Sequence, residues 1–324
     1  MDFREKAIEI LKGKEALVFC GGGVLGIAEC GALIALEELG VNMKNFKSVT
    51  GSSVGSILSS VIASDGTTEY MKKMLDTMEF SKFQDNDCFL VSFIQLITKY
   101  GLNKTTEIKN LATTLLKELT QNENITFKQL YDKTGVHLTI TYLSLNYKAT
   151  LYADYLTEPD SSVKEAIIKS SAIPLFYEAH VEGKGKGKQI SCDGGTLDNF
   201  PMGVPRKKGI DPNKILGLKL IASAEILHED NGGPGIPLQD NGAPPKALKY
   251  FLDIVDIMRK QALRLHVSKN DWMLSIKINV GTLSSTSFTL TKEEKEWLFN
   301  QGKQAVHNYV DELAGLLESG TYPY

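Results

Sequence analysis

Residues 16–26, ALVFCGGGVLG, join a continuous apolar run to a glycine-rich loop. The run Ala16–Cys20 is typical of a strand that is buried on both faces, as in parallel sheets covered by helices. A helix is predicted from Gly26 to Leu39, where apolar residues recur at helical spacing, and Gly40 is placed to end it. This order of strand, loop and helix favours an α/β fold.

A second unit of the same kind follows the first. The pattern predicts a strand at Lys47–Thr50, the tight turn GSSVG at 51–55 and a further helix. Beyond it, the sequence predicts strands at 136–145, 148–154 and 189–192 and helices at 161–171 and 291–318, with only helices after Pro201. We therefore predict one domain over residues 1–324, a three-layer α/β/α structure with helices on both faces of the sheet. Its motif-bearing part spans 16–201, and its C-terminal part, 246–324, is expected to be helical.

Composition excludes several classes of protein. The 324 residues carry 36 Lys and Arg against 39 Asp and Glu, a net charge of −3, which argues against a nucleic-acid partner. The four cysteines are far apart and form no C-x-x-C pair, as expected of a reducing compartment. No signal peptide and no apolar run of about 18 residues is visible. We therefore expect a cytoplasmic protein that is soluble or peripherally bound to membranes.

Three segments have more than one interpretation. The run FLVSFIQLI at 89–97 is predicted to be a buried helix, with a lid or a membrane-contacting segment as the alternative. The Gly- and Pro-rich segment 228–245 is either a linker or a mobile flap. The loop GKGKGK at 183–188 is predicted to form the tip of a hairpin rather than a phosphate cradle.

The loop Gly21–Gly26 places successive backbone amides at a helix N-terminus, an arrangement that binds negative charge. Gly21, Gly23 and Gly26 also satisfy the dinucleotide pattern G-x-G-x-x-G. That interpretation requires an acidic residue at the end of the next strand, where this chain has Thr50-Gly51-Ser52-Ser53. The loop is thus better suited to an oxyanion hole, and a nucleotide-dependent enzyme remains an alternative.

Two further motifs supply a nucleophile and a base. Gly51-x-Ser53-x-Gly55 lies at a strand-to-helix turn, the setting of a nucleophile elbow, although small residues there could also simply pack the helix on the sheet. Asp193-Gly194-Gly195 follows a short strand, where the aspartate is either a base or the first residue of an Asx turn.

Four ordered blocks now resemble the patatin-like phospholipase family: GGGVLG at 21–26, GSSVG at 51–55, SSAIPLF at 170–176 and DGGTLDNFP at 193–201. The resemblance implies a calcium-independent lipid acyl hydrolase of the phospholipase A or lysophospholipase type, with no cofactor and no catalytic metal. It implies that Ser53 is the nucleophile and Asp193 the base, in a dyad without histidine that acts through an acyl-enzyme.

The resemblance also assigns supporting roles. The amides of Gly21, Gly22, Gly23 and Val24 would form the oxyanion hole, Gly51 and Gly55 would shape the elbow, and Gly26, Gly194 and Gly195 would support the site. The block around Ser171 would pack beside the dyad as a structural element. A membrane lipid or a lipid droplet surface would be the partner, and an activating protein is possible.

Three alternatives to this assignment stay open. Leu25 stands where many family members carry Arg or Lys, as in the branch that contains triacylglycerol lipases, so neutral glycerides are alternative substrates. The chain could also be a catalytically weak lipid-binding regulatory protein. A Ser-Asp-His triad is the third alternative, with His228, His266 or His307 as the base.

Overall fold

A computed structural model describes residues 2–85, 89–223, 250, 254, 257–258, 261–263, 265–286 and 288–322. The segment 228–245, His228 and Cys88 lie outside the described residues.

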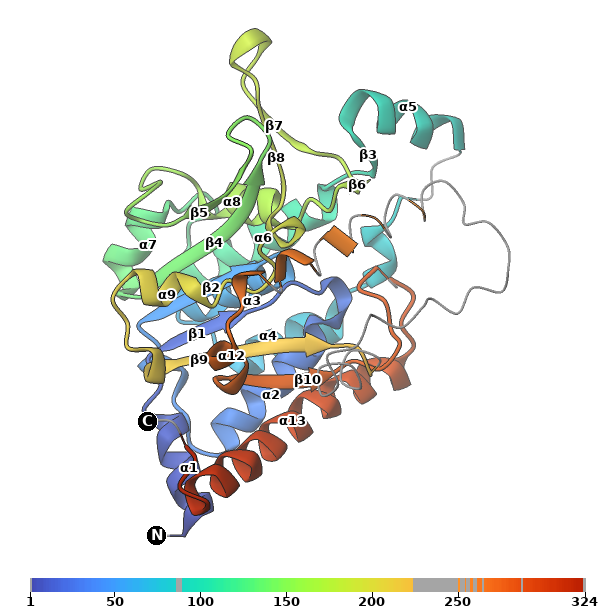
Figure 1. Cartoon of the computed structure of the whole chain (residues 1–324). Helices are drawn as coiled ribbons and strands as arrows, with labels where there is room; N and C mark the ends of the chain where they lie inside the picture. The colour runs from blue at the N-terminus through green and yellow to red at the C-terminus, as the bar shows by residue number, and fades with distance from the viewer. Residues whose placement is uncertain are drawn as a thin grey trace.

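An eight-stranded mixed sheet forms the middle of the molecule (Figure 1). Its order is β10-β9-β1-β2-β4-β8-β7, and β5 pairs with β4 outside that path. The first five strands in that order are parallel to their neighbours, whereas β8, β7 and β5 pair antiparallel. The strands span Ala16–Phe19 (β1), Ser48–Ser52 (β2), His137–Ser144 (β4), Ala149–Ala153 (β5), His180–Glu182 (β7), Gln189–Asp193 (β8), Ile215–Ile221 (β9) and Ser275–Asn279 (β10). A separate parallel pair joins β3 (Gly101–Asn103) to β6 (Leu175–Tyr177).

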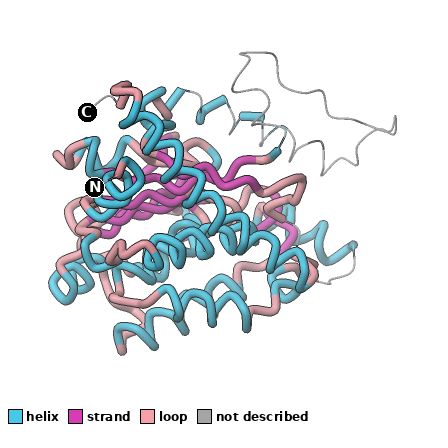
Figure 2. Tube along the Cα trace, turned by 90° about the horizontal axis from the view of Figure 1, so that it is seen from below, coloured by secondary structure: helices cyan, strands magenta, loops and turns pink. Residues whose placement is uncertain are grey.

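Helices lie on both sides of the strands, as the view from below shows (Figure 2). The prediction of a three-layer α/β/α structure is therefore confirmed. The helices span Phe3–Lys12 (α1), Gly26–Glu38 (α2), Val54–Ala63 (α3), Thr68–Thr77 (α4), Phe89–Lys99 (α5), Thr106–Thr120 (α6), Phe127–Thr134 (α7), Val163–Ser171 (α8), Gly203–Lys207 (α9), Lys269–Met273 (α12) and Lys292–Glu318 (α13).

The expectation of only helices after Pro201 is wrong. Strands β9 and β10 lie in that part of the chain and extend the sheet beside β1. Every residue of β9 is buried, so its composition is continuously apolar apart from Lys219 and lacks the alternation that marks a half-exposed strand. β10 is only five residues long and carries Lys277 in its centre, which leaves a weak sequence signal.

The prediction that residues 89–97 form a buried helix is wrong in its burial. The helix forms as α5, but Val91, Ile94 and Ile97 are 45%, 53% and 61% exposed. Gln95 is buried instead. The apolar run therefore predicted the helix correctly but did not predict its burial.

Helix α13 is predicted correctly, including its start: Thr291 and Glu294 form a capping box. The helix packs along α2 through glycines that allow the two backbones to touch (Figure 1). A Cβ atom on Gly302 would lie 1.8 Å from the carbonyl oxygen of Ala28, and one on Gly31 would lie 2.0 Å from that of Phe299. Both contacts are with backbone atoms, so a side-chain movement could not make room for a Cβ atom at either glycine.

We expect Gly302→Ala to lower the free energy of unfolding by about 1–3 kcal/mol, because the new methyl group would push α13 away from α2. Gly315→Ala is the matched control in the same helix, since no atom lies within 4 Å of the position its Cβ would take. The control should gain about 0.5–1 kcal/mol from its lower unfolded-state entropy. Urea unfolding of both variants measures the difference, and equal effects would contradict the close contact.

Candidate active site

Ser53 stands at the predicted turn between a strand and a helix. β2 ends at Ser52 and α3 begins at Val54, so Ser53 is the residue that connects them. Its φ of 53° and ψ of −125° are costly for a residue with a side chain. Small neighbours are required here, because a Cβ on Gly51 would lie 2.0 Å from the carbonyl oxygen of Gly55. The serine is thus held on a strained, tightly packed elbow.

Asp193 is the last residue of β8, and its side chain is held by a local hydrogen bond. Oδ1 accepts a hydrogen bond of 2.6 Å from the amide of Gly195, so the Asx-type turn is present. The residue is 5% exposed. The Asx turn does not exclude a role for Asp193 as a base, because the turn holds the carboxylate through a hydrogen bond to one of its two oxygens, Oδ1.

The register of β4 brings Ser53 and Asp193 together. β5 pairs with residues 140–144 of β4 and therefore takes one edge of that strand. β2 and β8 must share the other edge, where Ser52 lies opposite Thr141 and Asp193 lies opposite Tyr142. Neighbouring positions on a strand are about 3.4 Å apart along its axis. The end of β2 therefore meets the end of β8, beside Ser53.

The end of α8 connects the two strand ends. Ser170 Oγ accepts a hydrogen bond of 2.9 Å from the backbone amide of Ser53. The carbonyl oxygen of Ala172 accepts one of 2.9 Å from the amide of Asp193. The start of the block at 170–176 thus contacts the backbone of both Ser53 and Asp193, and the contact of Ser170 with Ser53 was missed by sequence reasoning. The repeated serines of that block were its only sequence signal.

Asn199 links the glycine loop to the Asp193 turn. Its Nδ2 donates to the carbonyl oxygen of Gly21 at 3.0 Å, and its own carbonyl oxygen accepts from the Gly21 amide at 3.0 Å. A Cβ on Gly21 would lie 2.4 Å from Asn199 Oδ1 and 2.9 Å from the Cβ of Ser53. A Cβ on Gly195 would lie 2.3 Å from the same Oδ1 atom. Both glycines are needed because the loops touch. Asn199 lies within the sequence block 193–201, but the sequence pattern predicted no role for this residue.

The glycine loop offers fewer amides than the sequence suggested. The amide of Gly21 is bound to Asn199, and that of Val24 donates to the carbonyl oxygen of Ser285 at 3.2 Å. Among the described residues, no acceptor is found for the amides of Gly22 and Gly23. In this conformation, two of the four amides expected to form the oxyanion hole, those of Gly21 and Val24, already donate to backbone carbonyl oxygens.

The remaining predicted site residues support the loop contacts. A Cβ on Gly26 would lie 2.6 Å from a methyl group of Val54, and one on Gly194 would lie 2.3 Å from the carbonyl oxygen of Thr141. Gly26 therefore allows α2 to meet α3, and Gly194 allows the Asp193 turn to meet β4. Leu25 is 6% exposed, so its side chain belongs to the core.

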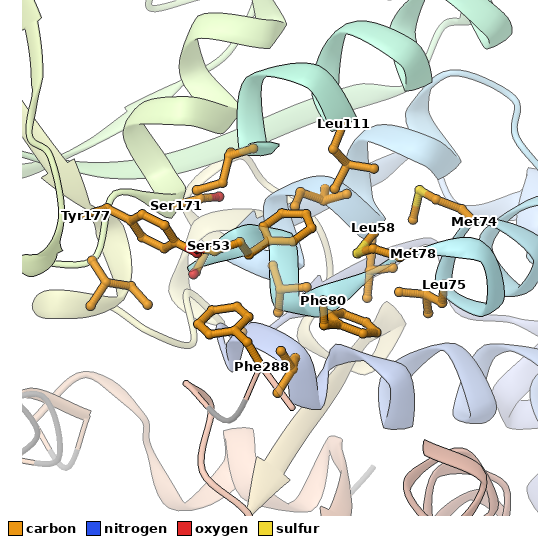
Figure 3. A pocket seen from close by; sticks show the side chains of 17 residues that line it. Ser53, Leu58, Met74, Leu75, Met78, Phe80, Leu111, Ser171, Tyr177 and Phe288 are labelled. Atoms are coloured by element: carbon orange, nitrogen blue, oxygen red, sulfur yellow. The ribbon is translucent and has the colours of Figure 1, made fainter. Parts of the chain in front are cut away.

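An apolar pocket begins at Ser53 (Figure 3). Its space measures about 610 Å³, including the open part. Gly23, Val24, Ser53 and Ser171 line one part of it. Apolar side chains from α3, α4 and α6 line other parts, together with Met78, Phe80, Phe83, Ile173, Tyr177 and Phe288. Phe288 closes one side, where its ring stacks on Phe83 and Phe176 with centroids 6.2 Å and 5.5 Å apart. The lining is almost entirely apolar, so the pocket suits a hydrocarbon chain better than a polar ligand.

Two of the four described histidines, His137 and His180, lie beside carboxylates. His137 contacts Asp154 and Lys208, and His180 lies near Glu165 and Glu182. His266 is exposed, and its charge acts on Asp198. His307 belongs to α13, the helix that packs on α2 and α1.

Two further titratable groups near the site, a carboxyl group and a thiol, are buried. Asp198 accepts a hydrogen bond of 2.7 Å from the hydroxyl of Tyr152, and burial raises the pKa of its carboxyl above the ordinary value. Burial, and then the charge of Asp193, raises the pKa of the neighbouring Cys192 thiol to about 12. That thiol is therefore not a nucleophile at neutral pH.

Glu29 lies beneath the glycine loop, in the first turn of α2. Its Oε1 accepts a hydrogen bond of 3.1 Å from the amide of Cys20, the residue before Gly21. Complete burial raises the pKa of the Glu29 carboxyl well above its ordinary value, an effect that the charge of Lys219 partly offsets. An acidic residue inside the apolar sequence GIAECGALIAL was a visible signal that sequence reasoning did not use.

Among the described residues, no group of three or more His, Cys, Asp or Glu side chains is arranged to hold a metal ion. No helix within the described part of the chain is long and apolar enough to cross a bilayer.

The chain is similar in sequence to a known protein family and to individual proteins. A family model described as patatin-like phospholipase matches residues 17–205. An uncharacterised protein of Bacillus subtilis, YqhO, is 26% identical over 90% of this chain and 97% of its own length. Triacylglycerol lipase 5 of Saccharomyces cerevisiae is 30% identical over 51% of this chain and 22% of its own length.

A solved structure has the same fold. VipD from Legionella pneumophila superimposes with a TM-score of 0.58, covering 92% of this chain and 67% of VipD at 16% identity. The similarity extends across the part of the chain after residue 205, which the family model does not match.

Glu29→Gln should stabilise the protein increasingly as the pH rises from 5 to 8. Because the pKa of Glu29 is raised in the folded state, its contribution is complete below the unfolded pKa, near 4.5, and is lost as the pH rises toward the folded pKa. The loss amounts to about 1.4 kcal/mol for each pH unit between the two pKa values, and glutamine does not incur it. Thermal unfolding at several pH values measures this, with the exposed Glu38→Gln as control. A difference that stays constant with pH would show that Glu29 ionises normally.

Proposed function

The chain belongs to the patatin-like phospholipase family, and from that premise we propose that it hydrolyses fatty-acyl esters of lipids through a Ser53–Asp193 dyad. The observation that carries the proposal is the strand register, in which the ends of β2 and β8 meet on one edge of β4. An apolar pocket begins at the serine so placed.

The proposed reaction has two halves. Ser53 Oγ attacks the ester carbonyl carbon while its proton passes to Asp193, and the carbonyl oxygen becomes an oxyanion near the amides of Gly22 and Gly23. As the tetrahedral intermediate collapses, the C–O bond breaks and Asp193 returns the proton to the leaving alcohol. Water then attacks the carbonyl carbon of acyl-Ser53 while one of its protons passes to Asp193. As this second tetrahedral intermediate collapses, the bond between Ser53 Oγ and the carbonyl carbon breaks, Asp193 returns the proton to Ser53 Oγ, and the fatty acid is released.

Pre-organisation supports the attack of Ser53. The hydrogen bond from the Ser53 amide to Ser170 and the one from Asp193 to Ala172 fix both catalytic groups to the end of the same helix. These contacts hold the strained backbone at Ser53 in place, so the serine is positioned before substrate binds.

The proposed substrate is a (lyso)phospholipid, and a neutral glyceride is the second candidate. Two observations favour the second: a relative at 30% identity is named a triacylglycerol lipase, and Leu25 provides a buried apolar side chain in the oxyanion loop. Both substrates carry the same acyl ester and use the same pocket, so the experiment must offer both.

We expect Ser53→Ala and Asp193→Asn each to lower fatty-acid release by at least about 10³-fold, because each removes one half of the proton transfer that the attack requires. Release is measured with lysophosphatidylcholine, phosphatidylcholine vesicles and a triacylglycerol emulsion, all in the presence of a chelator.

Substitution of each histidine by alanine is the matched control and should leave the rate within a few-fold of that of the native chain. Loss of activity with one histidine variant would favour a triad instead. Restoration of activity by calcium would contradict calcium independence. Absence of release from every lipid would favour the lipid-binding alternative.

Met74→Trp should lower the hydrolysis of long-chain esters while leaving short-chain esters unaffected. Met74 lies on α4 in the part of the pocket away from Ser53 (Figure 3), so a larger side chain there would shorten the space for the chain. A loss of a few methylene contacts corresponds to about 10- to 100-fold in kcat/KM. Lys73→Trp on the exposed side of the same helix is the control. A uniform loss over all chain lengths would contradict the assignment of the pocket.

A further inference from the structure

Among the side chains of helix α5 that the structure describes, three apolar ones are exposed and a polar one is buried. Val91, Ile94 and Ile97 are 45%, 53% and 61% exposed, whereas Gln95 is 6% exposed. Apolar side chains on one side of a helix are normally buried against the core, because water contact is unfavourable for them. A helix that turns this side outward indicates contact with something apolar outside the chain.

A lysine-rich loop lies beside the end of α5. The loop Gly183–Lys188 connects β7 to β8 and presents Lys184 and Lys186 to solvent. Lys188 Nζ lies 3.4 Å from the hydroxyl of Tyr100 and 5.2 Å from the centroid of its ring. The β7–β8 hairpin and α5 project from the same side of the molecule (Figure 1).

The turn between β4 and β5 continues this surface. Asn146 donates from Nδ2 to the carbonyl oxygen of Lys188 at 3.0 Å, and its Oδ1 accepts from the amide of Ile190 at 2.8 Å. The residues on either side of it, Leu145 and Tyr147, are 49% and 70% exposed. Contacts from Tyr100 through Lys188 to Asn146 therefore join the three segments. We name the outward side of α5, the 183–188 loop and the 145–147 turn the docking rim.

The charge of the docking rim is positive. The nearby carboxylates already have partners: Glu178 pairs with Lys99 at 3.1 Å, and Glu182 pairs with Lys169 at 3.0 Å. Lys184 and Lys186 have no carboxylate within ion-pair distance among the described residues. Exposed lysines beside exposed apolar and tyrosine side chains match the layered chemistry of a lipid surface with anionic headgroups.

The docking rim is connected to the pocket. β3 follows α5 directly and pairs with β6, with Asn103 opposite Tyr177. Tyr177 lines the pocket that begins at Ser53. Only the pair of strands β3 and β6 would thus separate a lipid surface bound to α5 from the pocket at Ser53.

We propose that the docking rim binds a lipid surface carrying anionic headgroups, with the apolar side of α5 inserted among the acyl chains and the lysines at the headgroups. This inference rests on the proposed function, because binding to a lipid surface would bring Ser53 to its substrate. The binding itself involves none of the catalytic residues.

Vesicle sedimentation with the Ser53→Ala chain tests the proposal without turnover. Vesicles of phosphatidylcholine alone are compared with vesicles in which one third of the lipid is phosphatidylglycerol. We expect tighter binding to the anionic vesicles, and a loss of about 30-fold in partitioning for Lys184→Gln/Lys186→Gln, which should disappear at high salt. Ile94→Ser/Ile97→Ser should cost about tenfold or more on both kinds of vesicle.

The matched control is Lys269→Gln/Lys277→Gln, which removes the same charge from exposed positions outside the docking rim. Failure of the chain to bind either vesicle would overturn the proposal, as would an equal loss in the control. The proposal would also be overturned if the rim variants changed the oligomeric state, measured by light scattering, but left vesicle binding unchanged.

Hydrolysis of a soluble short-chain ester by the same variants with Ser53 intact separates this proposal from the proposed function. The rim variants should hydrolyse that ester at the native rate. If the native chain does not hydrolyse it, the proposed function fails, and the vesicle measurement still decides the role of the docking rim.

Discussion

One edge of β4 accommodates the ends of two other strands, and the candidate site depends on this arrangement. β2 pairs with β4 up to Thr141, and β8 pairs with the next position, Tyr142, from the opposite direction. Both strands must therefore end there. A strand that ends against another strand has to turn sharply, which explains the strained backbone of Ser53 and the Asx turn at Asp193.

Close packing around this junction explains the residue types that surround it. The elbow, the glycine loop and the Asp193 turn approach each other so closely that side chains are excluded at Gly51, Gly21 and Gly195. Asn199 fills the remaining space and satisfies the backbone of Gly21 in both directions. The amide of Gly21 is thus bound to Asn199 and that of Val24 to Ser285, and Gly23 and Val24 of this loop line the pocket.

Polar and apolar side chains occupy different parts of the candidate site. Polar groups lie in the layer between the strand ends and α8, whereas the pocket beyond Ser53 is formed by aliphatic and aromatic side chains. Water in such a pocket has few partners, so an acyl chain replaces it readily. The exposed apolar side of α5 adds a second apolar surface on the outside of the same region. Together these features suit a molecule whose substrate resides in a lipid phase.

The sequence by itself determined the local elements and the identity of the chemical groups. ALVFC, the glycine loop and GSSVG define a strand, an anion-binding loop and an elbow through short-range backbone preferences, so α2, β2 and α3 could be predicted, as could the cap of α13. Only the tertiary structure decided which groups meet. The junction on β4, the role of Ser170, the contact of Asn199 with Gly21 and the outward side of α5 all depend on pairings between residues far apart in the chain. β9 was missed because burial on both faces removes the alternation by which a half-exposed strand is recognised in sequence, and β10 was missed because it is only five residues long and carries Lys277 in its centre.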